Sequence, residues 1–203
     1  MIRAGLARII PALFLVGGML TSVATAEAQA YTHDGFFLRL AGGFGYSDLS
    51  ENDTDQSVHG GSFGMNVAIG GMVIPNLAIH GTLSGMSMFD PSVSNGITSV
   101  DLDDTTVGIG GLGAGVTYYF MPINLYISGS LLLAQAHVDV NGIERDSDVG
   151  LMLNTVVGKE WWIHQEWGIG VAGMLDLGTV PHDNSDDSST VVGFHVLFTA
   201  TYN

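Results

Sequence analysis

The amino-acid sequence predicts an all-β fold, a closed barrel of eight antiparallel strands that run up and down. Three observations support this prediction: apolar and polar residues alternate with a period of two, the connections alternate between short and long, and the prolines after residue 30 fall at connections. Only 12% of the 203 residues are charged and 29 are glycines, a composition that favours strands and turns over helices. The length suits one domain.

The alternation is clearest at the end of the sequence, over residues 189–202. Every second residue from 192 onward is apolar, as Phe198 is, and the residues between them are small or polar, as Thr199 is. Leu197 is the one exception. Residues 36–47 repeat the pattern, with Arg39 in the polar set and Phe37 as the exception. Six further strands are predicted at 61–73, 77–89, 105–120, 124–139, 149–163 and 166–179.

The connections distinguish a barrel from a soluble β-sandwich, which alternation alone leaves open. Short links around residues 75–76, 122–123 and 164–165 follow the second, fourth and sixth strands, and longer polar loops follow the odd-numbered strands. Short turns at one end and long loops at the other are typical of transmembrane barrels of the outer membrane. Pro75 and Pro122 fall in the short links, and Pro91 and Pro181 fall in the long loops.

Aromatic residues are concentrated near the predicted short-turn end. Rings at one level predict a girdle at the membrane interface, although strands are enriched in aromatic residues in any case. The residues assigned to this girdle are Phe36, Tyr118, Tyr119, Phe120, Tyr126, Trp161, Trp162, Trp167 and Tyr202.

The first thirty residues have the pattern of a cleaved signal peptide. Arg3 and Arg8 precede a mostly apolar stretch at 9–23, and residues 28–30 offer a small-residue cleavage site, with 24–26 as the rival site. The alternative is a single membrane anchor, for which the apolar stretch is short and contains Pro11. We therefore expect a signal peptide at 1–30 and a barrel at 31–203.

With these features, the sequence resembles the small outer-membrane barrels typified by the OmpA transmembrane domain, OmpX and OmpW. The resemblance rests on the signal peptide, the opening at residues 35–40, the layout of four loops and three turns, and the alternating last strand. It implies a monomeric barrel in contact with outer-membrane lipids, with both termini in the periplasm.

Alternation also predicts a cluster of charges inside the barrel. If Phe36 and its alternating neighbours face lipid, Arg39 points into the lumen, where an unpaired charge is costly. We expect Glu160 and Glu166 as its partners and Lys159 outside, at the interface. The cluster is expected to extend to Asn66, His80, Asn154, Asp176 and His195. It would fill the lumen of an eight-stranded barrel or, as the alternative, line a gated pore.

The long loops are strongly acidic. After residue 30, three basic residues stand against nineteen acidic ones, which argues against nucleic acid as a partner. Calcium or magnesium could relieve the repulsion between loop carboxylates, although no twelve-residue calcium loop is present and acidic loops are often simply solvated. The metal candidates are Asp101, Asp103, Asp104, Asp183, Asp186 and Asp187. The chain has no cysteine, which excludes disulfides and thiolate metal sites.

Three functions are compatible with this sequence. The first is a structural or surface-interaction barrel with an unknown extracellular partner, without catalytic residues or a cofactor. The second is a barrel that transports a small solute, as the resemblance to OmpW allows. The third is a lipid-modifying hydrolase or acyltransferase, for which His137 and Asp139 are the nearest approach to a catalytic pair.

Overall fold

The computed structural model describes residues 33–51, 56–95, 97–102, 105–140, 143–181 and 188–203. The predicted signal peptide lies outside these ranges. No helix within them is long and apolar enough to span a membrane.

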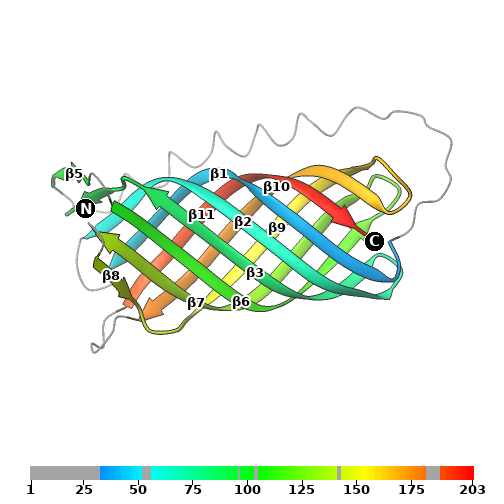
Figure 1. Ribbon diagram of the computed structural model, residues 1–203, viewed down its shortest axis with the longest axis horizontal. Coiled ribbons are helices and arrows are strands. Elements are labelled where there is room, and N and C mark those ends of the chain that lie inside the picture. Colours follow the sequence, from blue (N-terminus) through cyan, green and yellow to red (C-terminus); the bar gives the residue numbers. More distant parts are fainter. Residues whose placement is uncertain (1–32, 52–55, 96, 103–104, 141–142, 182–187) are drawn as a thin grey trace, which may run out of the picture. The chain divides into compact units, whose positions relative to one another are not determined.

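Eight long antiparallel strands form a closed barrel, as predicted (Figure 1). Their order around the ring is β1, β2, β3, β6, β7, β9, β10 and β11, and β11 pairs with β1 to close it. Each predicted strand agrees with an observed one to within a few residues. The bounds are β1 (Phe36–Glu51), β2 (Ser57–Ile74), β3 (Leu77–Phe89), β6 (Thr105–Phe120), β7 (Leu125–Val140), β9 (Gly150–Trp162), β10 (Trp167–Pro181) and β11 (Ser188–Tyr202).

Three short strands that were not predicted extend the barrel wall at the long-loop end. β4 (Ser92–Ser94) and β5 (Ser99–Asp101) pair with each other, and β4 also pairs with β2. β8 (Ile143–Asp146) pairs with the end of β7. The connections between β3 and β6 and between β7 and β9 therefore contain ordered sheet as well as loop.

The short turns close the opposite end of the barrel. Asn76 and Asn124 have positive φ angles of 69° and 52°, a left-handed conformation that asparagine tolerates better than most residues. Backbone bonds tie these turns to their neighbours: the amide of Tyr119 donates to the carbonyl of Asn76, and the amide of Glu160 donates to that of Asn124. This end is a compact rim, against which the lumen side chains pack.

Burial alternates with a period of two along the long strands, and the exposed residues are largely apolar. On β11, Phe198 is 77% exposed and Leu197 is fully buried. Leu197 and Phe37 are the two apolar residues at positions where the sequence pattern has small or polar ones. Both occupy inward-facing positions of their strands and lie in the core. The apolar outside and packed inside are the reverse of a soluble sandwich, whose apolar faces meet each other.

Candidate functional site

The lumen of the barrel holds the charged residues that the sequence places there, Arg39 and Glu160. Both side chains are at most 1% exposed. Arg39 donates from Nη2 to the hydroxyl of Ser128 at 3.0 Å and from Nη1 to that of Thr117 at 3.4 Å. Glu160 accepts from the hydroxyl of Thr201 at 2.6 Å. Hydroxyls on the barrel wall thus replace part of the hydration that each charge would have in water.

Two buried tyrosines lie between these charges. The Arg39 guanidinium carbon is 4.6 Å from the centre of the Tyr126 ring, a cation–π contact. The Tyr126 and Tyr119 rings are 5.4 Å apart, and the Tyr119 hydroxyl donates to Glu160 at 3.4 Å. No direct ion pair joins Arg39 to Glu160 in the described part of the chain. Their attraction therefore acts across the tyrosine pair, in an interior where it is screened less than in water.

The predicted inward position of Glu166 is wrong. Glu166 is exposed in the turn between β9 and β10, where its carbonyl accepts from the backbone amide of Asn203. The strand β9 ends at Trp162 and β10 begins at Trp167, so strand alternation does not extend to residue 166. Lys159 lies outside, as expected, with Nζ donating to the carbonyl of Ile123 and lying over the Trp161 ring.

A hydroxyl network continues from Arg39 along the lumen. His80 contacts Thr117 and Thr82, each at 2.9 Å. Thr82 contacts Ser130 at 2.8 Å, and the Thr117 hydroxyl donates to Ser128 at the same distance. Three neighbouring strands of the wall, β3, β6 and β7, are linked by these contacts, so the network braces the barrel from the inside.

Closer to the long loops, a second polar group spans the lumen. Asn66 donates from Nδ2 to Asn154 Oδ1 at 3.0 Å, and Asn154 Nδ2 donates to Asp176 Oδ1 at 2.7 Å. His195 contacts the hydroxyl of Ser62 at 2.8 Å. The sequence placed Asn66, Asn154, Asp176 and His195 inside, and all four are buried in the lumen. The Asn66–Asn154–Asp176 contacts connect β2 with β9 and β10 across the lumen.

His33 caps the short-turn end of the lumen and was missed by the sequence analysis. Its ring is fully buried, stacks on Tyr119 at 3.6 Å and contacts Asn124 Oδ1 at 2.7 Å. His33 precedes β1, so the alternation within the strand could not indicate which way its side chain points. The residue therefore closes the barrel just before the first strand begins.

The aromatic girdle is confirmed only in part. Phe36, Tyr118, Phe120, Trp161 and Trp167 are 38–50% exposed on the outside, at the short-turn end. The girdle prediction is wrong for three residues, because strand parity turns them toward the lumen: Tyr119, Tyr126 and Trp162.

Most of the metal candidates in the acidic loops lie outside the residues that the structure describes. Asp103, Asp104, Asp183, Asp186 and Asp187 lie outside the described residues. The sixth metal candidate, Asp101, accepts from the hydroxyl of Ser92 at 2.6 Å. Within the described ranges no group of three or more His, Asp or Glu residues has metal-binding geometry. Calcium or magnesium at these loops stays a prediction.

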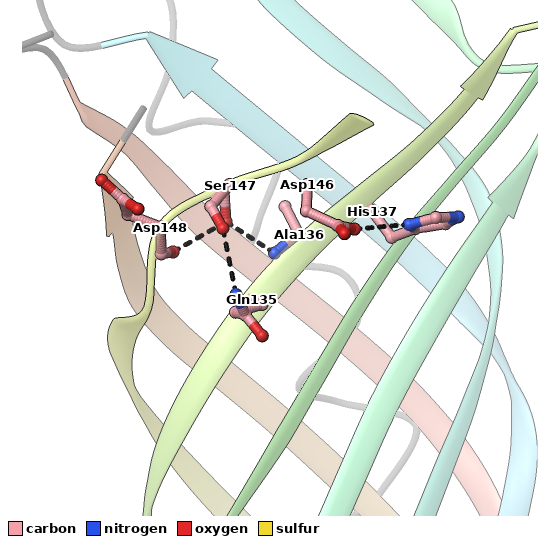
Figure 2. A network of polar contacts seen from close by, with 6 residues as sticks. All are labelled: Gln135, Ala136, His137, Asp146, Ser147 and Asp148. Carbon is pink, nitrogen blue, oxygen red and sulfur yellow. Dashed lines mark hydrogen bonds and ion pairs between the residues drawn. The ribbon is translucent and has the colours of Figure 1, made fainter. Parts of the chain in front are cut away.

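At the same end, His137 on β7, one member of the sequence-based candidate pair, bonds to Asp146 on β8. Its Nδ1 lies 2.6 Å from the carboxylate of Asp146 (Figure 2). The adjacent hydroxyl of Ser147 donates to the carbonyl of Asp148 and accepts from the amide of Ala136. These contacts fasten β8 to β7 and direct the serine hydrogen toward the backbone.

A cavity of about 430 Å³ lies inside the barrel at the long-loop end. Residues from β1, β2, β4, β6, β7, β8, β10 and β11 contribute to its lining. Ala136 and Val180 belong both to this lining and to the buried apolar cluster beneath it, and Leu49 packs against that cluster. The cavity is thus a vestibule above a packed apolar layer.

These features define a closed, eight-stranded, up-and-down β-barrel with an apolar outside and buried polar side chains in its lumen, the fold of the small outer-membrane barrels. The structure is similar to neisserial surface protein A (NspA), at 17% identity and a TM-score of 0.56, with 83% of this chain and 96% of that chain covered. At this identity the likeness shows the fold alone.

Two other solved barrels are more distant. Ail, the attachment invasion locus protein of Yersinia pestis, is 11% identical over 82% of this chain and 99% of its own, with a TM-score of 0.43. OprG of Pseudomonas aeruginosa is 12% identical over 84% and 98%, with a TM-score of 0.45. No protein-family model and no curated protein matches the chain by sequence.

Proposed function

We propose that the chain is a monomeric outer-membrane barrel with a structural or surface-interaction role, a lumen sealed by side chains and acidic extracellular loops. The observation that carries the proposal is the apolar outer wall. Large apolar side chains are exposed on all eight long strands, among them Phe44, Leu112, Leu131 and Phe198 at 61–77%. Such a surface is stable in lipid and would aggregate in water.

An even number of strands places both termini at the same end of the barrel, the end that carries the short turns. We infer that this end lies in the periplasm, as short turns do in outer-membrane barrels. The short turns would then face the periplasm and the longer loops the exterior. The acidic loop surface suits an extracellular partner that carries positive charge.

The proposal is tested by membrane fractionation, refolding and conductance. The mature protein should refold into lipid vesicles or detergent, migrate faster on gels before heating than after, and give no discrete channel openings in planar bilayers. An epitope tag placed between β4 and β5 should be accessible on intact cells. A mature chain that is monomeric and folded in water without detergent would disprove the membrane assignment.

The second candidate is transport of a small solute, and the loop-end cavity favours it. A solute that enters there would have to displace the Asn66–Asn154–Asp176 group to go further. Discrete single-channel openings, or uptake that depends on the barrel in liposomes, would support transport over the sealed barrel.

A further inference from the structure

We propose that the lumen binds a soft monovalent metal ion of the copper(I) class, held by the imidazole of His195 and the thioethers of Met86 and Met174. This inference goes beyond a structural or surface-interaction role, because it assigns a ligand to the inside of the barrel. It rests on a histidine nitrogen that has no partner, on the hydrogen bonds that fix the protonation of that histidine, and on two sulfur-containing side chains beside its ring.

The ring of His195 has one nitrogen in use and one to spare. The residue projects from β11 into the lumen and is fully buried. Its Nε2 contacts the hydroxyl of Ser62 at 2.8 Å, whereas its Nδ1 is buried without a hydrogen-bond partner among the described residues. A buried polar atom that is left without a partner costs stability. Nδ1 is therefore the atom that a ligand would satisfy.

A chain of three hydrogen bonds fixes which nitrogen of His195 carries the proton. Ser47 donates its one hydroxyl hydrogen to Met86 Sδ at 3.0 Å, since a thioether can only accept. The 2.8 Å contact between Ser47 and Ser62 must then use the hydrogen of Ser62. The contact between Ser62 and His195 must in turn use a hydrogen on Nε2. A neutral His195 thus has its lone pair on Nδ1, and a histidine whose other nitrogen donates in this way is oriented as a metal ligand.

Two methionine side chains lie beside this ring. Met174 on β10 is directly opposite His195 in the β10–β11 register, and both side chains are buried in the lumen. Met86 comes from β3, which β2 and β1 separate from β11. A Cβ atom built on Gly193 would lie 2.7 Å from Met86 Sδ and 3.3 Å from His195 Cε1, the ring carbon bonded to Nδ1. A Cβ atom built on Gly64 would lie 2.6 Å from the His195 ring and 3.0 Å from Met174 Cε. The two glycines leave the room in which the imidazole and both methionines come together.

These ligand types select a soft ion. Thioether sulfur is polarizable and suits copper(I), and imidazole binds copper as well, whereas calcium and magnesium require oxygen ligands. A monovalent ion also brings less charge into the interior than a divalent one, which lowers the cost of its desolvation. Methionines that only fill space would retain no ion, so metal retention distinguishes the two roles.

The test uses copper(I), kept reduced by ascorbate, and silver(I), which needs no reductant. The full mature protein is refolded into nanodiscs with each ion present, so the result does not depend on how an ion reaches a packed lumen. The chain has no cysteine, so thiolates contribute no background. After desalting, elemental analysis should find one ion per barrel, and X-ray absorption at the copper edge should show sulfur and nitrogen neighbours. Zinc(II) should bind at least about tenfold more weakly. Failure to retain copper(I) and silver(I), oxygen neighbours alone, or equal retention of zinc(II) would overturn the proposal.

Variants assign the ion to this cluster. Met86→Leu and Met174→Leu nearly conserve side-chain volume, and each should weaken copper(I) at least about tenfold in competition with a chromogenic chelator. Met65→Leu is the matched control, since Met65 is 39% exposed on the outer wall. His195→Gln should lose the ion, and His164→Gln, in the exposed turn between β9 and β10, should retain it. Each variant is first checked for heat-modifiable migration on gels, which separates loss of binding from loss of the barrel. Unchanged affinity in the lumen variants, or an equal loss in the two controls, would refute the assignment.

Discussion

Arg39 illustrates how one buried charge is accommodated without a direct ion pair. Its guanidinium has hydroxyl partners and the Tyr126 ring, and Glu160 lies beyond the paired rings. The cost of burying each charge is thus shared among several polar contacts on different strands. Removing either charge leaves the other less well compensated in the same interior.

A double-mutant cycle measures this coupling. Arg39→Met should lower the free energy of unfolding by about 2 kcal/mol, less than the 3–5 kcal/mol typical of breaking a direct buried pair. The same substitution in a Glu160→Gln background should cost less by about 1 kcal/mol. Urea unfolding in lipid vesicles measures both values. A coupling free energy near zero would show that the two charges act independently.

Gly158 makes room for Tyr126. A Cβ atom at position 158 would lie 2.6 Å from Cζ of the Tyr126 ring, closer than such atoms approach. Gly158→Ala should therefore displace the ring and destabilise the barrel by about 1–3 kcal/mol. Gly129→Ala on β7 is the control, because a Cβ there meets nothing within 4 Å. Equal stability of the two variants in the same unfolding assay would contradict the close packing of Tyr126.

At the scale of strands, periodicity predicted the long elements and missed the short ones. The eight long strands have one face toward the core and one away from it, so their period of two is visible in the sequence. β4, β5 and β8 have at most four residues each, too few for a period. β4 pairs with β2, β5 pairs with β4, and β8 pairs with β7. These short strands form by pairing within the assembled barrel wall, so the pattern of their own residues does not predict them.

The candidate site was predictable to the extent that strand parity reaches it. Arg39, Glu160 and Asp176 follow from alternation within strands, and parity also places Tyr119 inside, because its neighbours Tyr118 and Phe120 face outward. The position of Glu166 could not be obtained in this way, because the turn interrupts the register.

A substitution on the outward face of β11 can test whether this face is in contact with lipid or with water. Phe198 is 77% exposed, so in lipid Phe198→Arg should destabilise the barrel by about 2–4 kcal/mol if it lies near the bilayer midplane. Phe198→Leu is the control and should be nearly neutral. Urea unfolding in vesicles makes the comparison. An arginine that is tolerated as well as leucine would indicate that this face meets water rather than lipid.

At the scale of the whole molecule, the barrel divides into layers along its axis. His33 caps the short-turn end, the tyrosine and hydroxyl layer follows, then the Asn66–Asn154–Asp176 group, the apolar cluster and finally the cavity. Polar and apolar layers alternate, so the lumen is a packed interior rather than a uniform water channel. This layering underlies the prediction that the barrel does not conduct.

The pairing of β1 with β11 makes the chain cyclic in space, since Leu38 is opposite Tyr202 and the Phe36 and Tyr202 rings lie 6.1 Å apart. Joining residue 203 to residue 33 through a brief glycine–serine linker and opening the chain at residues 164–165 should therefore give a circular permutant that refolds with native gel mobility. Where the polypeptide starts would then matter to the export machinery but not to the ring of strands.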